Sequence, residues 1–268
     1  MKRTIITALF FGVFLTSCEK TLIDSESAAN VPVIKSYINC GDNSIGVEII
    51  KITPYSNDEV SDTQAITGLS VYINDLALYE ASPGIYKLNL SGDKVEAGDV
   101  YNLKFEFKGK TITTSTVIPE KAGNFSISDT VLEMERIDSG SMGPGPDSFD
   151  PIEITWNNPN AEYHFLAIKY MEVSEDYIDM NMAGKNFPKM RNTAPNTDNA
   201  FNISGRDLQF FGTYRIILFT VNKEYAELYE NVSSSSNNLT NPVSNIINGW
   251  GIFTGINSDT LFLEVKEE

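Results

Sequence analysis

The sequence predicts an all-β protein in which two β-sandwich domains, of the immunoglobulin and fibronectin type III kind, follow one another along the chain. Apolar and polar residues alternate from residue 31 onward, as in residues 69–73, which read LSVYI. Turn residues interrupt this alternation about every 8–12 residues, a spacing that such sandwiches show. Apolar residues make up 41% of the chain and charged residues 21%, which is typical of a folded globular protein.

The first predicted domain is an immunoglobulin- or prealbumin-like sandwich over residues 31–119. At Ser82-Pro83-Gly84 the proline fixes φ and the glycine supplies a positive φ, so this triplet predicts a turn. Lys108-Gly109 predicts a hairpin. Seven short strands are expected, at residues 33–38, 45–52, 69–73, 76–79, 85–90, 100–107 and 111–118.

The second predicted domain, a fibronectin-III-like β domain, covers residues 120–268. A strand that ends in Trp156, an Asn-Pro turn and a long following strand resemble the B–C corner of fibronectin type III sandwiches. Residues 223–232 have apolar side chains at helical spacing, which predicts one short helix. Strands are expected at residues 131–137, 152–156, 163–171, 211–221, 250–254 and 260–265.

The N-terminus has the pattern of a lipoprotein signal peptide over residues 1–17. Lys2 and Arg3 precede an apolar segment at residues 5–15, which is too short to span a membrane as a helix. The following Leu-Thr-Ser-Cys resembles a bacterial lipobox, so Cys18 is the predicted lipid-attachment residue. The alternative is a plain signal peptide with an unrelated cysteine. Residues 18–30 then form an acylated, flexible tether.

Composition excludes several classes of protein. The formal net charge of −16 disfavours nucleic-acid binding, which needs a basic surface. One His and two Cys are too few for a His/Cys zinc cluster or for a disulfide scaffold. With Cys18 acylated, Cys40 is the single remaining thiol; we expect it to pack as a small hydrophobic residue, with a reactive thiol as the alternative.

Several segments together resemble one protein family. They are residues 82–86 (SPGIY), 97–103 (AGDVYNL) with 116–119 (TVIP), 155–159 (TWNNP) and 241–253 (NPVSNIINGWGIF). These segments are similar to Bacteroidota outer-membrane lipoproteins with domain of unknown function 4249. The resemblance implies a lipid anchor on the periplasmic face or the cell surface, and a role beside TonB-dependent nutrient receptors. It implies no catalytic residue, because no activity is established for the family.

The resemblance also suggests O-glycosylation at Asp-Ser/Thr-aliphatic triplets, which such bacteria use on exported proteins. Two triplets fit, with Thr130 and Thr260 as their acceptor residues.

No catalytic motif is evident. The sequence contains no Gly-x-Ser-x-Gly elbow, P-loop or dinucleotide fingerprint. His164, the single histidine, lies in a strand pattern that favours a surface or core role over that of a general base. Pairs among the 36 acidic residues leave glycoside hydrolysis open, because sequence does not give carboxylate separations. We predict a non-enzymatic protein.

Calcium is the metal ion that best suits the acidic loops, because it prefers oxygen ligands. Asp138, Asp147 and Asp150 flank a Gly-rich loop and are the candidate ligands. The alternative is a solvated acidic loop. No other cofactor is expected.

Two tryptophans and one long loop are the candidate ligand-binding elements. Trp156 and Trp250 could each stack on a sugar or a peptide side chain, or lie in the core. Phe187 and Met182 belong to the irregular segment 172–200, which forms either an adaptable contact surface or a loop without a ligand.

The sequence therefore predicts an accessory or ligand-binding partner of a TonB-dependent receptor, with a glycan or peptide as the ligand. The alternative is a structural or adhesive surface lipoprotein that binds host or matrix glycans or proteins.

Overall fold

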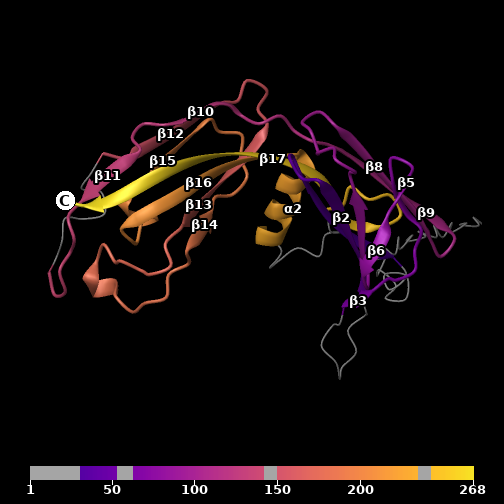
Figure 1. Cartoon of the computed structure of the whole chain (residues 1–268), viewed down its shortest axis with the longest axis horizontal. Helices are drawn as coiled ribbons and strands as arrows, with labels where there is room; N and C mark the ends of the chain where they lie inside the picture. Colours follow the sequence, from indigo (N-terminus) through magenta and orange to yellow (C-terminus); the bar gives the residue numbers. More distant parts are fainter. Residues whose placement is uncertain (1–30, 53–62, 142–149, 235–242) are drawn as a thin grey trace, which may run out of the picture.

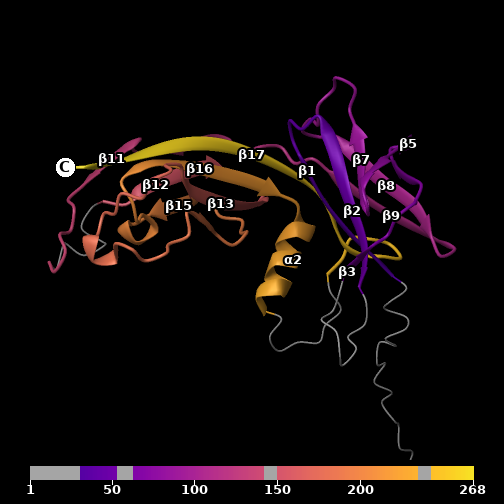
Figure 2. The same cartoon turned by 60° about the horizontal axis from the view of Figure 1, so that its bottom comes forward.

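The computed structural model describes residues 31–52, 63–141, 150–234 and 243–268, and the all-β prediction is confirmed (Figure 1). These residues form three β-sheets of ten, four and three strands and one α-helix. Figures 1 and 2 show two lobes that share the long strand β17 (Trp250–Glu267), with helix α2 (Lys223–Ser234) between them. The helix predicted at residues 223–232 is thus confirmed.

The first lobe is built from two sheets that enclose a core. One is the ten-stranded sheet, which contributes the strands β17-β1-β2-β7-β6, with β3 paired to β2, and continues into the second lobe; the other has the order β5-β4-β8-β9. The free thiol of Cys40 packs against this core from a half-buried position. The strands are β1 (Pro32–Asn39), β2 (Ser44–Ile52), β3 (Thr63–Ala65), β4 (Val71–Ile73), β5 (Leu76–Ala77), β6 (Tyr79–Ser82), β7 (Ile85–Asn89), β8 (Val100–Phe107) and β9 (Lys110–Val117).

The turns follow from local chemistry. Lys108 and Gly109 both have positive φ, 49° and 74°, which gives the tight hairpin between β8 and β9 that the sequence predicts. Gly84 has φ 73°, and a Cβ there would lie 2.8 Å from the backbone oxygen of Ile49. Only glycine therefore suits the turn between β6 and β7.

The second lobe places a three-stranded sheet, in the order β10-β12-β15, against the strands β14-β13-β16-β17. A second core lies between these layers. The remaining elements are β10 (Gly123–Ile127), β11 (Val131–Met134), β12 (Ile152–Asn157), β13 (Tyr163–Tyr170), β14 (Met190–Asn192), β15 (Ala200–Ile203) and β16 (Gly212–Val221), with short 3-10 turns at Met180–Met182 and Gly205–Asp207.

Strand β17 corrects the prediction of two separate closing strands at 250–254 and 260–265. The structure has one strand of 18 residues. Its first part pairs in parallel with β1, its second part pairs antiparallel with β16, and its end pairs with β11. Between the two predicted strands, Asn257 and Ser258 pair with Thr220 and Phe219 of β16. The Asn257 side chain also donates to the backbone oxygen of Pro119 (2.8 Å) and accepts from the Ser258 amide.

The two lobes share residues across the predicted boundary at 119. Ile246 and Phe253, from the predicted second domain, are buried in the core of the first lobe. Polar contacts also join the lobes: Asn222 donates to the Thr116 hydroxyl (3.0 Å), and Glu224 accepts from the Thr254 hydroxyl (3.0 Å). A boundary drawn at residue 119 therefore separates residues that pack together.

Within the part of the chain that the structure describes, no helix is long and apolar enough to cross a membrane. The predicted signal peptide and tether, residues 1–30, lie outside the described residues, as do residues 142–149 of the predicted Gly-rich loop.

Strand pairing at the start of β17 requires glycine at position 251. Gly251 has φ 103°, and a Cβ there would overlap the backbone oxygen of Ile34 in β1. We expect Gly251→Ala to lower the free energy of unfolding by at least about 2 kcal/mol, because it combines an unfavourable φ with a backbone clash. Urea denaturation measures this change. Gly46→Ala is the control, because no atom lies within 4 Å of the added Cβ; an equal loss there would contradict the explanation.

Candidate functional site

In the second lobe, the strands β14-β13-β16-β17 have one face toward the core and one face away from it. On β13, Leu166, Ile168 and Tyr170 belong to the core, so the alternating residues lie on the opposite face. We call this opposite face the outer face. It comprises Tyr163, Phe165, Ala167 and Lys169 of β13; Arg215, Ile217 and Phe219 of β16; Ser258, Thr260, Phe262 and Glu264 of β17; and Met190 and Asn192 of β14.

An aromatic cluster lies where α2 covers one end of the outer face. The rings of Phe165 and Phe219, on neighbouring strands, stack with centroids 4.6 Å apart. Tyr225 of α2 stacks on Phe165 at 5.5 Å. Tyr37 of β1 meets Tyr225 edge-on at 6.1 Å. The cluster therefore combines rings from both lobes, at the position where β17 passes from one to the other.

The two tyrosine hydroxyls of this cluster are neutral and available to hydrogen-bond to a ligand. Burial raises the pKa of both Tyr37 and Tyr225, so both hydroxyls stay protonated at neutral pH. Neither hydroxyl is hydrogen-bonded to another residue in the described ranges. Tyr37 is 37% exposed and Tyr229, one turn further along α2, is 40% exposed. Rings with free hydroxyls can stack on a ligand and hydrogen-bond to it.

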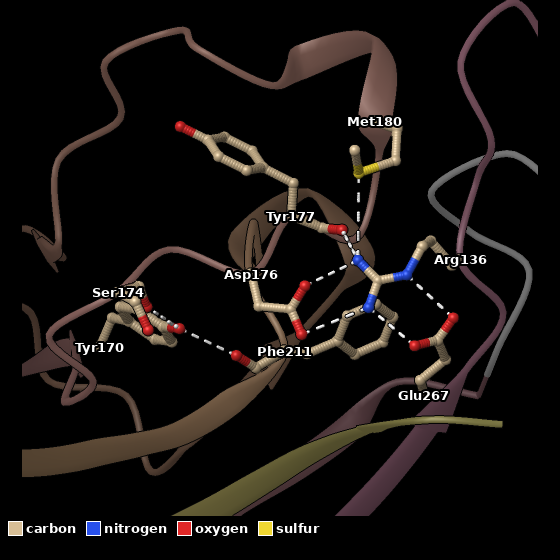
Figure 3. A network of polar contacts seen from close by, with 8 residues as sticks. All are labelled: Arg136, Tyr170, Ser174, Asp176, Tyr177, Met180, Phe211 and Glu267. Carbon is tan, nitrogen blue, oxygen red and sulfur yellow. Dashed lines mark hydrogen bonds and ion pairs between the residues drawn. The ribbon is translucent and has the colours of Figure 1, made fainter.

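A second polar arrangement lies at the other end of the lobe, around Arg136 (Figure 3). Its guanidinium binds Asp176 (2.7 and 3.2 Å) and Glu267 (2.9 and 2.7 Å), and it also donates to the backbone oxygen of Tyr177. The same group lies over the Phe211 ring, 4.7 Å from its centroid. Since every donor direction has a partner, we interpret this network as a structural clamp that ties the end of β17 to the segment that follows β13.

The clamp and the core fix much of the segment 172–200. Phe187 is half-buried and meets Phe210 of the second core edge-on at 6.4 Å. Met182 is also half-buried, and its sulfur accepts a hydrogen bond from Lys185 (3.0 Å). The structure therefore places these two predicted ligand-binding residues against the protein itself, in a segment that includes β14 and a 3-10 turn.

The two tryptophans differ in their surroundings. Trp156 is 5% exposed and belongs to the second core, so its ring cannot act as a surface platform. Trp250 is half-buried at the start of β17, opposite Val33. The core interpretation of Trp156 fits the structure; its use as an exposed ligand-binding residue does not.

His164 is buried, with 1% of its surface exposed. Its Nδ1 lies 3.0 Å from the backbone oxygen of Glu162, and its ring is 5.8 Å from that of Trp156. Burial lowers the pKa of His164, so the ring is neutral at neutral pH. Its Nε2 and the Trp156 Nε1 are buried without a hydrogen-bond partner among the described residues.

The other predicted sites occupy separate places. Asp138 and Asp150 are exposed, and Asp147 lies outside the described residues. In the described ranges, no group of three or more His, Cys, Asp or Glu residues could hold a metal ion. Thr130 is exposed between β10 and β11, and Thr260 is exposed on the outer face. Cys18 lies outside the described residues. The lipid, calcium and glycosylation sites therefore stay predictions.

Sequence reasoning missed the aromatic cluster, although a signal for it exists. Residues 163–168 and 214–221 are apolar at nearly every position, which indicates burial on both faces of a strand rather than on one. One face packs on the three-stranded sheet, and the other receives α2. The pairing of Tyr37 with Tyr225 has no local signal, because 188 positions separate them.

The fold and the site define a two-lobed, all-β protein with an aromatic surface at the junction of its lobes. The chain belongs to the family of proteins with domain of unknown function 4249 (DUF4249), whose model matches residues 19–261. The resemblance of the sequence to the DUF4249 domain is therefore confirmed. The matched range includes almost all the described residues of both lobes. No curated protein matches the chain.

The clamp predicts a pH-dependent contribution to stability. The hydrogen bonds from Arg136 hold the pKa of Glu267 below its ordinary value of 4.5. Because the folded-state pKa is the lower one, the contact stabilises the protein above about pH 4.5, and this contribution disappears as the pH falls through the folded pKa. Glu267→Gln should therefore be less stable than the wild type near neutral pH, and this difference should shrink as the pH falls below 4.5, as measured by urea denaturation. A difference independent of pH would contradict this assignment.

Replacement of Arg136 itself should lower the stability of the protein more than replacement of Glu267. Arg136→Met removes both ion pairs and the bond to Tyr177 but keeps an apolar stem over Phe211. We expect the Tm to fall by about 2–4 °C, the shift that about 1 kcal/mol produces in a protein of this size. Calorimetry measures it. The control is Lys121→Met, which breaks a single exposed pair with Asp259 and should change the Tm by less.

Proposed function

We propose that this protein is a non-enzymatic, lipid-anchored outer-membrane protein that binds a ligand or partner at the junction of its lobes and assists a TonB-dependent nutrient receptor. The lipobox pattern that ends at Cys18 supports the anchor. Membership of the DUF4249 family supports the setting, through the receptor association that the sequence resemblance implies.

The aromatic cluster is the observation that carries the binding role. Its rings come from β1, β13, β16 and α2. The hydroxyls of its two tyrosines, Tyr37 and Tyr225, are neutral and without a protein partner among the described residues. A junction with fixed geometry also limits the entropy that binding must overcome, because the shared strand holds the rings in place before the ligand arrives.

The tether sets how far the lobes can stand from the membrane. Residues 18–30 are 13 residues, which reach at most about 45 Å when extended. This length suits contact with a neighbouring membrane protein, because it keeps both lobes within reach of the surface. The acyl chains then raise the effective concentration of the protein near that partner.

The first test is a pull-down of the full-length, tagged protein from membranes in mild detergent, with mass spectrometry as the readout. We expect a TonB-dependent receptor in stoichiometric amount, and its loss in Cys18→Ala, which removes the anchor. Recovery of the protein alone, from membranes that contain such receptors, would contradict the accessory role. The adhesive alternative would then be tested with host glycans and matrix proteins.

The second test asks whether the aromatic cluster forms the contact. Tyr37→Ala removes a ring from the cluster at an exposed position, so we expect the receptor yield to fall several-fold while the fold is kept. Tyr72→Ala is the matched control, since Tyr72 is 39% exposed on the four-stranded sheet of the first lobe. Equal yields from the two variants would place the contact elsewhere on the protein.

A further inference from the structure

Two cationic side chains lie side by side on the outer face, at the end away from α2. Lys169 of β13 and Arg215 of β16 are directly opposed in the antiparallel register. Directly opposed residues have Cβ atoms about 4.5–5.5 Å apart and point to the same face. Lys169 is exposed and Arg215 is half-buried.

Neither cation has a protein partner in the part of the chain that the structure describes, since no hydrogen bond or ion pair involves Lys169 or Arg215. The Nε of Arg215 is buried and without an acceptor. Directly opposed like charges repel one another, and an unpartnered buried donor is unfavourable.

The acidic composition of the chain makes two cations without an acidic partner among the described residues unexpected. The chain has 36 acidic residues and 20 basic ones, so carboxylates are abundant. Glu264 also lies on the outer face, but its carboxylate forms an ion pair with Lys266, with 3.2 Å between Oε2 and Nζ. An anion from outside the chain that lies between the two side chains would relieve the repulsion between their charges.

Apolar side chains flank the two cations. Phe262 of β17 is directly opposed to Arg215, and Met190 of β14 is directly opposed to Lys169. Phe262 is 54% exposed and Met190 is 51% exposed. These four residues therefore form one row across β17, β16, β13 and β14, in the order apolar, cationic, cationic, apolar. Exposed apolar groups beside unpaired cations suit a ligand that has both an anionic group and an apolar body.

We propose that this row binds a small organic anion, in which a carboxylate lies between Lys169 and Arg215 and an aromatic or apolar body packs on Phe262. The proposal rests on the proposed ligand-binding function and names the chemical class of the ligand. Arg215 and Phe219 are four residues apart on β16, about 13 Å, so one elongated ligand can reach both this row and the aromatic cluster.

Titration calorimetry of the full-length protein in detergent tests the proposal with three probes: 3-phenylpropionate, its neutral amide 3-phenylpropionamide, and inorganic sulfate. We expect the carboxylate to bind at least about ten-fold more tightly than the amide, since a charge-assisted contact distinguishes the two. Sulfate should bind more weakly than 3-phenylpropionate, because it has no apolar body. Equal affinity for carboxylate and amide, or for carboxylate and sulfate, or no binding of 3-phenylpropionate at millimolar concentration, would overturn the proposal.

Variants assign the binding to this row. Arg215→Met and Lys169→Met should each lower the affinity for 3-phenylpropionate at least about ten-fold. Lys104→Met is the control, because Lys104 is an exposed lysine on β8 of the first lobe; an equal loss there would overturn the proposal. Arg215→Met should have a Tm equal to or above that of the wild type, since it removes an unpaired charge. If Arg215→Met fails to fold, Arg215→Lys, which keeps the charge, and Lys169→Met decide the result.

The outcome is separable from that of the receptor pull-down. Carboxylate binding that depends on Arg215, without a co-purified receptor, would support the ligand class and contradict the receptor role. A co-purified receptor without carboxylate binding would contradict the ligand class alone.

Discussion

The hydrogen bonding of a single strand determines the architecture. The first part of strand β17 pairs with β1 in the first lobe, and its second part pairs with β16 in the second lobe. Because backbone hydrogen bonds hold both parts of β17 within one ten-stranded sheet that runs through both lobes, separating the lobes requires breaking strand pairing rather than bending a linker. Glycine at position 251 allows this pairing, since the backbone of β1 passes where a side chain would lie.

The shared strand also brings together the residues of the candidate site. It places Tyr37 beside α2, so that rings from distant parts of the sequence form one cluster. The polar contacts of Glu224 and Asn222 hold the start of α2 against both lobes. The outer face then extends from this cluster to the pair formed by Lys169 and Arg215, on strands whose other face is fixed by the second core. A rigid support of this kind keeps a surface site in place before a ligand binds.

Local patterns in the sequence were accurate where the structure is local. Alternation located most of the strands, and Lys108-Gly109 located a hairpin, since both depend on a few neighbouring residues. Reasoning from the sequence was wrong about the closing strands, because residues 255–259 pair with β1 and β16 and join the two predicted strands into one. It also left Trp156 between surface and core, because alternation says which residues share a face and not whether that face is covered.

The sequence by itself determined the all-β class, the positions of most strands and turns, the helix after residue 222 and the membership of the DUF4249 family. The tertiary structure alone decided that one strand serves both lobes, that Trp156 is buried, and that Tyr37 meets Tyr225. It also decided that Lys169 and Arg215 lie directly opposite each other on neighbouring strands. The physical reason is that strand pairing joins residues far apart in the chain, and such pairing depends on which surfaces meet rather than on local periodicity.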